Sequence, residues 1–469
     1  MNLEYYEKEV EKILPSLQKE NDVYNEYELS DIIDIIAKTI SMYDDEKTKI
    51  LKGIVRFILL RRFNIRYTVC DDEEISSYQD LIVKDYDYPH SEYKEDEYLK
   101  KRQIVEDIKK IPQFEQKSAE WLAQRNECLT ATAVATAIDE DPYNDPIKCI
   151  YDKCGLSPPF EENENVHHGK KYEQIANMYY CFRNNIVVDE FGLLTHPTKK
   201  YIAASPDGIC GHTRYDKEGL SRLVGRLLEI KCPKKRKIRK TGELNGEICP
   251  HYYWVQCQVQ MFVTGLDECD FLQCEIGEYP DYETMWEDSK KNCPGLSKET
   301  GLEKGCVIQL LPKRLITDDK NQCLWHALYL YPPRLHMTRK ETDEWILNET
   351  INFHKHKLSE NFVFDKVICW KFTTIACNLI KADKEWMKSQ IPILKQFWSY
   401  IKFYRDNRDK LNSLQKYVEK VGVNQTAKIF KRIHEDYSEE YESDAEPLHQ
   451  TENKWRKEYN EKKKKWQKK

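Results

Sequence analysis

The feature that most constrains the fold is an alternation of helix-like and strand-like segments between residues 105 and 405. The helical patterns lie at residues 118–138, 167–182, 251–264, 339–357 and 384–404, the last interrupted by Pro392. The strand-like runs lie at residues 193–197, 201–208, 226–232, 270–276, 306–311 and 324–331. Residues 280–304 are expected to form a surface insertion. Such alternation is typical of one large α/β domain, which we expect to span residues 105–405.

Residues 1–70 are expected to form a helical N-terminal region. Isoleucines recur at four-residue spacing on one helical face, and Ser30 can cap the start of that helix. These isoleucines are Ile32, Ile36 and Ile40. A second helix is expected between Asp44 and Phe63.

Two charged segments flank the α/β domain. Residues 71–104 are acidic and rich in tyrosine, and we interpret them as a linker; an acidic mimic of DNA that covers a basic groove is the alternative. Residues 406–469 form a charged C-terminal tail, helical or disordered, in which residues 435–446 are acidic and residues 454–469 basic. The basic end is either a solvated helix end or a tail that contacts DNA phosphates.

Composition excludes several classes of protein. The chain has 469 residues, with 74 Lys and Arg against 80 Asp and Glu, so a site for a polyanion must be a local basic patch. No membrane segment is expected, because arginines interrupt the apolar stretch 54–63 and a membrane span needs about 20 apolar residues. The 16 cysteines include no C-x-x-C pair, and no secretory signal precedes them. They indicate reduced thiols in an intracellular compartment, rather than disulfides or a zinc or iron–sulfur site.

Two short motifs carry the chemistry. S-P-D-G at residues 205–208 reads by itself as a tight turn. E-I-K-C-P at residues 229–233 reads as a strand end, in which Glu229 and Lys231 share one face because alternate strand residues point the same way. An exposed edge strand would show the same pair, so each motif is ambiguous alone.

Taken together, the two motifs predict a metal site. An Asp at the end of one strand and a Glu-x-Lys on the next strand can converge on one point. The carboxylates of Asp207 and Glu229, with the Ile230 carbonyl, are hard oxygen ligands of the kind that Mg²⁺ prefers. Lys231 would then orient an attacking water or stabilise charge on a phosphate.

Two helices carry further candidates. Glu173, in G-K-K-Y-E, is either a carboxylate that positions metal or water or an ordinary exposed acid in a first helical turn. Gln256 and Gln260 share a helical face, from which their amides can donate to a phosphate or a bound water. The aromatic run 252–254 would stack on an unpaired base or belong to the core. The basic run 234–240 is either a nuclear localisation signal or a phosphate track beside the site.

The ordered set G-K-K-Y-E, S-P-D-G, E-I-K-C-P and Y-W-V-Q-C-Q resembles the lambda-exonuclease, or YqaJ-like viral recombinase, family of the PD-(D/E)xK nucleases. The resemblance covers residues 115–275 and extends towards residue 405. It implies a restriction-endonuclease-like α/β fold, a mixed sheet flanked by helices, here with a helical N-terminal region and a helical C-terminal extension. The 21 residues between Asp207 and Glu229 make a longer connection than in compact members, either a long hairpin tip or a DNA contact.

The resemblance also implies an activity and partners. It implies an exonuclease that depends on Mg²⁺, with Mn²⁺ as a substitute, and that acts 5′→3′ on double-stranded DNA ends in recombination, repair or replication. A single-strand annealing protein is the implied partner, a homo-oligomer is the implied assembly, and the host cytoplasm or nucleus is the compartment if the chain is viral. The implied catalytic residues are Glu173, Asp207, Glu229, Lys231 and Gln256, and the implied metal ligands are Asp207, Glu229 and Ile230. The upstream W…R…T segment, with the Ser of S-P-D-G, implies DNA-phosphate contacts by Arg125, Thr132 and Ser205.

Two rival functions stay open at this point. A structure-selective endonuclease or an RNA nuclease would use the same metal core. A catalytically inactive DNA-binding scaffold would have lost a ligand, whereas Asp207, Glu229 and Lys231 are all present.

Overall fold

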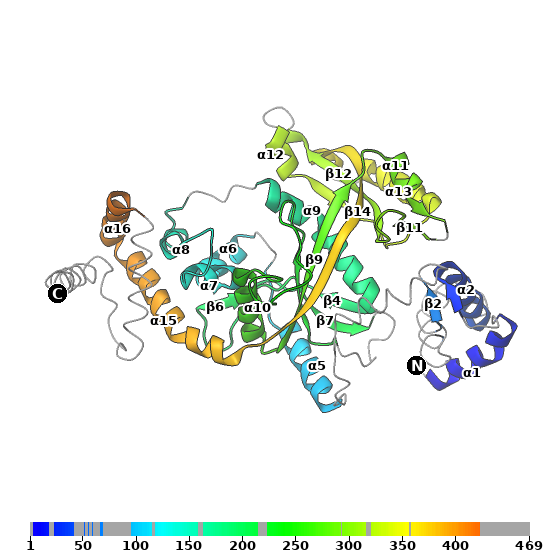
Figure 1. Cartoon of the computed structure of the whole chain (residues 1–469), viewed down its shortest axis with the longest axis horizontal. Helices are drawn as coiled ribbons and strands as arrows, with labels where there is room; N and C mark the ends of the chain where they lie inside the picture. Colours follow the sequence, from blue (N-terminus) through cyan, green and yellow to red (C-terminus); the bar gives the residue numbers. More distant parts are fainter. Residues whose placement is uncertain are drawn as a thin grey trace.

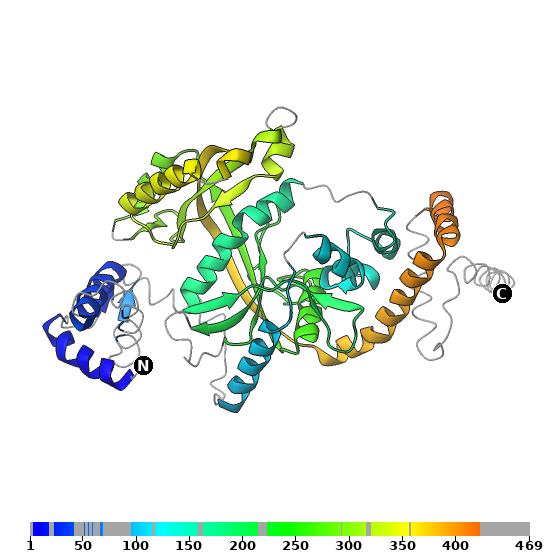
Figure 2. The same cartoon turned by 180° about the vertical axis from the view of Figure 1, so that it is seen from behind.

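The chain folds into a mixed α/β structure (Figures 1 and 2). The computed structural model describes residues 3–17, 23–41, 51, 55, 59, 66–68, 95–114, 118–157, 163–213, 223–291, 293–315, 320–355 and 358–422. Among these residues, no helix combines the length and apolar character needed to cross a bilayer. The fifteen cysteines among them are all free thiols.

A curved sheet of seven strands forms the centre of the fold, in the order β13-β12-β14-β9-β8-β7-β4. Strands β8 and β9 pair in parallel and the other neighbours are antiparallel, so the sheet is mixed, as expected for the fold class. The bounds are β4 Ile186–Asp189, β7 Gly208–Thr213, β8 Leu227–Lys231, β9 Glu268–Glu278, β12 Lys304–Pro312, β13 Leu328–Leu330 and β14 Phe362–Lys381.

Helices α9 (Glu164–Asn184) and α10 (His251–Thr264) cover opposite faces of this sheet. Side chains of successive β8 residues point to opposite faces of the sheet: Leu228 and Ile230 pack with α9, while Leu227 packs with α10. Glu229 therefore points to the α10 side. The alternation of apolar residues along β8 thus decides which helix meets the functional carboxylate.

A second sheet, β3-β6-β5, lies beside α10. Its strands are β3 Leu129–Thr130, β5 Leu194–Thr195 and β6 Ile202–Ala204. The predicted helix at 118–138 is in fact two helices, α6 (Ala119–Asn126) and α7 (Ala131–Ala137), with β3 between them. Strand β3 pairs in parallel with β6, and Thr130 lies opposite Ala203. This pairing places the W…R…T segment beside the start of S-P-D-G.

Gly208 has a different role from the one predicted. It is not the flexible residue of a turn but the first residue of β7. A Cβ atom at this position would lie 2.1 Å from Cγ1 of Val188 on β4, so only glycine allows β4 and β7 to pack this closely. Close packing of β7 on β4 therefore explains the glycine of S-P-D-G.

The connection between β7 and β8 has described ends that pair as a hairpin, with Cys210 N–H donating to the Arg226 carbonyl at 2.8 Å. This agrees with a long hairpin; residues 214–222 lie outside the described residues. The expected insertion at 280–304 contains regular elements. These are α11 Tyr282–Glu287, β10 Ser289–Lys290 and β11 Cys293–Ser297.

The sequence prediction missed one central element and misplaced another boundary. Strand β14, 20 residues long, was not predicted, because its burial pattern is irregular and gives no clear period of two. Helix α15 (Lys384–Asp406) continues through Pro392 instead of being interrupted, since the proline lies on its exposed side. The remaining helices are α5 Glu95–Lys109, α8 Pro146–Lys153, α12 Lys320–Trp325, α13 Arg339–Lys355, α14 Leu358–Asn361 and α16 Arg408–Val421.

The described N-terminal residues include α1 (Leu3–Ile13), α2 (Glu26–Ser41) and a short parallel pair, β1 Val23–Asn25 with β2 Arg66–Thr68. Ile32 and Ile36 are buried in a common cluster, as predicted, but α2 begins at Glu26, so Ser30 lies inside the helix and does not cap it. In the predicted second helix, only Leu51, Val55 and Leu59 are described, and they are buried in that cluster. The predicted acidic linker falls outside the described residues up to position 94, and the charged tail does so from position 423.

Candidate active site

Asp207 and Glu229 lie opposite each other where β7 meets β8. Gly208 pairs with Leu228 in the antiparallel ladder, which sets the residue before Gly208 level with the residue after Leu228. The Asp207 carboxylate accepts a 2.6 Å hydrogen bond from the backbone N–H of Ile230. The long chain connection between the two motifs therefore does not separate them in space.

Glu229 is a fully buried carboxylate with a complete set of donors. Gln256 Nε2 donates to its Oε1 at 2.7 Å and Gln260 Nε2 donates to its Oε2 at 2.6 Å. Lys231 forms an ion pair with the same Oε1 atom. A buried charge is tolerated only when it is paired and hydrogen-bonded, and these contacts meet that condition.

The two glutamines belong to one functional pair, of which the predicted site included only Gln256. Both lie on the face of α10 that looks onto β8, one helical turn apart. Their spacing was the available signal for Gln260. Neither amide is directed at solvent, so their role is to hold Glu229 and not to reach a phosphate, as the spacing alone had also allowed.

Lys231 is a protonated lysine in this site. Desolvation alone would lower the pKa of its amine, but the charges of Glu229 and Asp207 outweigh it and raise the pKa well above the ordinary value. The ammonium group also lies 4.7 Å from the ring centroid of Tyr253, a favourable cation–π distance. Lys231 can therefore supply positive charge and hydrogen bonds at neutral pH.

The acids around Lys231 repel one another. Burial and the negative charge of Glu229 raise the pKa of Asp207 well above its usual value. Desolvation also raises the pKa of Glu173 against the opposing charge of Lys231, with smaller contributions from the charges of Glu229 and Glu190, although the Glu173 side chain reaches solvent at the surface of α9. A positive ion between Asp207 and Glu229 would relieve this repulsion.

The oxygen donors at the site suit a Mg²⁺ ion that takes only a few of its ligands from the protein. In the part of the chain that the structure describes, no group of three or more His, Cys, Asp or Glu side chains lies close enough together to hold a metal ion. Two carboxylates, from Asp207 and Glu229, and the neighbouring Ile230 carbonyl remain as donors. Mg²⁺ commonly takes one or two carboxylates and keeps several waters, so this set suits it.

The residues predicted to contact DNA phosphates lie on segments joined by the β3–β6 pairing. The Arg125 guanidinium stacks on Trp121 at 4.6 Å, and desolvation lowers its pKa. Thr132 is exposed, and its hydroxyl lies 3.2 Å from that of Thr130. Ser205 instead donates to the Phe191 carbonyl at 3.4 Å, a long bond that a phosphate oxygen could replace.

Comparison with known proteins assigns the chain. A model of the YqaJ-like viral recombinase domain matches residues 120–267. An uncharacterized protein of Acanthamoeba polyphaga mimivirus is 45% identical over 527 residues, covering 98% of this chain and 96% of that protein. The chain belongs to the YqaJ-like viral recombinase family. This confirms the family that the motifs resemble.

Two solved structures are also similar to this YqaJ-like protein. An alkaline exonuclease from Laribacter hongkongensis is 17% identical, with a TM-score of 0.32, and the match covers 64% of this chain and 100% of that one. A phage-related exonuclease from Haemophilus somnus is 10% identical, with a TM-score of 0.29, and the match covers 61% and 96% of the two chains.

A groove of about 520 Å³ opens at the end of β8 in this YqaJ-like domain. Catalytic candidates, bases and aromatic residues share its lining. The lining includes Glu173, Ile230, Lys231, Lys170, Lys234, Lys235, Arg236, Tyr143, Tyr252 and Tyr253. Trp254, by contrast, packs on Trp386 in the core, so the predicted aromatic run divides between groove and core.

The basic run of the YqaJ-like domain is partly neutralised by its own chain. Lys234 and Lys235 both form ion pairs with Glu164, and Arg236 donates to Gln273 at 2.8 Å. The run does border the groove, as a phosphate track would. A DNA phosphate must compete with Glu164 for these lysines.

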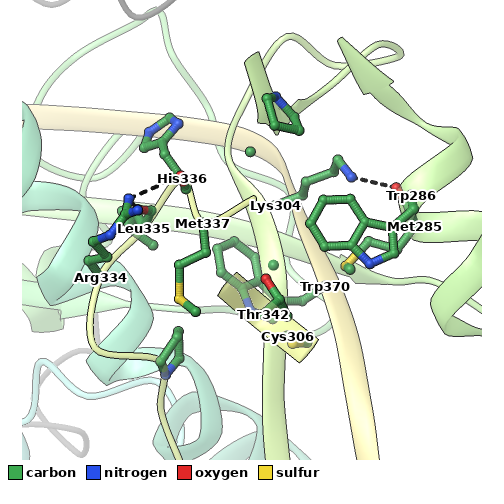
Figure 3. Close-up of a pocket in the computed structure, with 14 residues that line it drawn as sticks. Met285, Trp286, Lys304, Cys306, Arg334, Leu335, His336, Met337, Thr342 and Trp370 are labelled. Carbon is green, nitrogen blue, oxygen red and sulfur yellow. Dashed lines mark hydrogen bonds between the residues drawn. The ribbon is translucent and has the colours of Figure 1, made fainter. Parts of the chain in front are cut away.

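A second cavity lies between β11, β12 and α13, away from the candidate catalytic residues (Figure 3). Its volume of about 20 Å³ suits a single water molecule. Trp286 and Trp370 line it, and the indole nitrogen of Trp370 has no hydrogen-bond partner among the described residues.

Proposed function

We propose that this protein is a metal-dependent deoxyribonuclease that degrades duplex DNA from an end, in viral DNA recombination, repair or replication. The observation that carries the proposal is the convergence of Asp207, Glu229 and Lys231 at the junction of β7 and β8. The family assignment supports a nuclease role. A 5′→3′ direction is part of the proposal.

Three oxygen donors of the site would hold the metal ion. Asp207, Glu229 and the Ile230 carbonyl would hold Mg²⁺, or Mn²⁺ in its place, and the bound ion would polarise the scissile phosphate. Gln256 and Gln260 keep the Glu229 carboxylate in place.

Lys231 and Glu173 act on the reacting groups. Lys231 orients the attacking water and stabilises the negative charge that grows on the phosphate. Glu173 lies at the groove on α9, where it positions the attacking water.

Arg125 provides the first phosphate contact in this proposal. The described part of the chain contains no acidic partner within ion-pair distance of its guanidinium, which stacks on Trp121 instead. Arginine is suited to bidentate recognition of phosphate. Thr132 and Ser205 add hydroxyl donors along the same path.

The proposed setting follows from the family. Duplex DNA ends are the substrate, a single-strand annealing protein is the partner, and a homo-oligomer is the assembly. The free thiols suit an intracellular reducing compartment of the host. The division into residues 1–70, 71–104, 105–405 and 406–469 remains a proposal, with two boundaries that the helices cross. Helix α5 runs through position 104, and α16 packs Leu411 and Leu414 into the same core as the central domain.

The test is digestion of DNA carrying a label at one defined end, with Mg²⁺ or with EDTA. We expect mononucleotides or short products from linear duplex in Mg²⁺ and no products in EDTA or from closed circular DNA. Cleavage of closed circles would favour a structure-selective endonuclease, and preferential cleavage of RNA would favour an RNA nuclease. DNA binding without cleavage in Mg²⁺ or Mn²⁺ would indicate an inactive scaffold.

A further inference from the structure

Three tyrosine rings form a continuous row from solvent to the candidate catalytic lysine. The Tyr143 and Tyr252 rings meet edge to face with centroids 5.6 Å apart, and the Tyr252 and Tyr253 centroids are 4.1 Å apart. The Tyr253 ring then contacts the Lys231 ammonium group at 4.7 Å. All three rings line the groove.

Tyr143, at the outer end of the row, is unusually exposed. The residue is 77% exposed, the highest value among the large hydrophobic residues that the structure describes as exposed. Leaving an aromatic ring in water forfeits the stabilisation that its burial would give. The ring is therefore placed where a ligand, and not the core, can cover it.

The loop that presents Tyr143 is held in one shape. Asp141 accepts hydrogen bonds from the Tyr143 backbone N–H, the Asn144 amide and the Thr136 hydroxyl, each at 2.9 Å. Glu140, in the same loop, bonds to His251 at the start of α10 with a distance of 2.8 Å. The ring is thus pre-positioned, which lowers the entropy cost of binding a ligand on it.

The size and charge of the groove indicate what covers the ring. Its volume of about 520 Å³ lies in the range of about 300–1,000 Å³ typical of pockets for small molecules, so a single nucleotide fits within it. Lysines and an arginine line the same groove, which favours a phosphate backbone. Basic residues alternating with aromatic rings are typical of sites for single-stranded nucleic acid.

We infer that Tyr143 stacks on the base of an unpaired nucleotide at the end of the DNA strand being cut. The row of rings then leads that strand to Lys231. This inference rests on the proposed function and narrows its substrate to DNA whose end is single-stranded or frayed. Tyr252 supports Tyr143 from the side, since the two rings meet edge to face.

The test uses the full chain in EDTA, so that binding is measured without cleavage. DNA hairpins with a blunt end, or with a short unpaired 5′ or 3′ end carrying 2-aminopurine, serve as probes. We expect wild type to prefer an unpaired end and to quench the 2-aminopurine fluorescence by stacking. Tyr143→Ala should weaken binding of the preferred hairpin by about 5- to 150-fold and abolish the quenching, as expected for loss of one base–aromatic stack.

Two variants complete the design. Tyr143→Phe keeps the ring and should keep both the preference and the quenching. Phe114→Ala removes another half-exposed aromatic residue, one that does not line the groove, and should change neither. Equal binding of blunt and unpaired ends by wild type, or undiminished preference in Tyr143→Ala, would overturn the inference.

Failure of this inference can be told apart from failure of the proposed function. If Lys231→Ala abolishes cleavage while Tyr143→Ala binds and cuts like wild type, the nuclease stands and the stacking role is wrong. If wild type binds unpaired ends through Tyr143 but cuts no nucleic acid in Mg²⁺ or Mn²⁺, the stacking role stands and the nuclease proposal is wrong.

Discussion

Asp207 and Glu229 are neighbours across the β7–β8 ladder, although 21 residues separate them along the chain. The Ile230 N–H holds the Asp207 carboxylate at 2.6 Å, and two glutamines hold the Glu229 carboxylate at 2.6 and 2.7 Å. Burial and repulsion by the Glu229 carboxylate raise the pKa of Asp207 well above its usual value. A divalent cation held by the two carboxylates would offset that repulsion, so metal binding would also stabilise the fold.

Replacing Asp207 with Asn should separate metal binding from folding. Asn keeps an oxygen acceptor for the Ile230 N–H and removes one of two repelling charges, so in EDTA the variant should be at least as stable as wild type. Mg²⁺ at a hundred times its Kd should stabilise wild type by about 2.7 kcal/mol and the variant much less, as measured by thermal unfolding. The exposed Asp406→Asn serves as the control. An equal response to Mg²⁺ in wild type and Asp207→Asn would contradict the assigned metal site.

Gln260→Met should impair both the site and the fold. Glu229 would lose its donor at 2.6 Å, and a buried carboxylate without that partner costs about 1–3 kcal/mol of stability. Cleavage should fall as well, because Glu229 is no longer fixed. Gln258→Met, on the same helix, removes an equally buried amide that bonds to the Lys381 carbonyl away from the site. It should cost stability in urea unfolding without a comparable loss of cleavage; similar cleavage losses in both variants would argue against a positioning role.

Glu164→Gln should tighten DNA binding. The change frees Lys234 and Lys235 beside the groove from their ion pairs. Exposed ion pairs are weak, so the gain in affinity should be about 1.5- to 5-fold at low salt and should shrink as salt is added. Glu247→Gln frees Arg239, which does not line the groove, and should have less effect. Unchanged or weaker binding in Glu164→Gln would mean that these lysines do not contact DNA.

His168 should make the fold sensitive to acid. Burial, assisted by the charge of Lys171, lowers the pKa of this histidine from 6.5 to about 4. The unfolded chain therefore takes up a proton before the folded chain does, and the free energy of unfolding should fall as the pH drops from 6.5 to about 4. The loss attributable to this group is at most about 3 kcal/mol, at about 1.4 kcal/mol per pH unit.

The check is chemical unfolding over that pH range. His168→Phe should flatten the decline, whereas His326→Gln, which changes an exposed histidine, should leave it unchanged. A parallel decline in His168→Phe and wild type would assign the acid sensitivity to other groups.

Local sequence patterns predicted the candidate catalytic residues but not all of the residues that line the groove beside them. The alternation of residues in E-I-K-C-P predicted that Glu229 and Lys231 share one face of a strand. The position of Asp207 at the end of a neighbouring strand predicted that its carboxylate lies close to them. Both predictions were possible because they depend only on the geometry of the strand backbone. The roles of Glu164 and Tyr143 could not be predicted, since they depend on which distant segments share the groove. Strand β14 was missed because its irregular pattern of exposed and buried residues reflects insertion between β9 and β12, a property of the whole sheet.

The most direct measurement is single-turnover cleavage of end-labelled linear duplex in Mg²⁺ by wild type and Lys231→Ala, with DNA binding measured in parallel. Removing one positioned donor of transition-state stabilisation commonly costs about 100- to 1,000-fold in rate. The account predicts a loss of at least that size in Lys231→Ala, with DNA affinity largely retained. Cleavage by Lys231→Ala at the wild-type rate would contradict it.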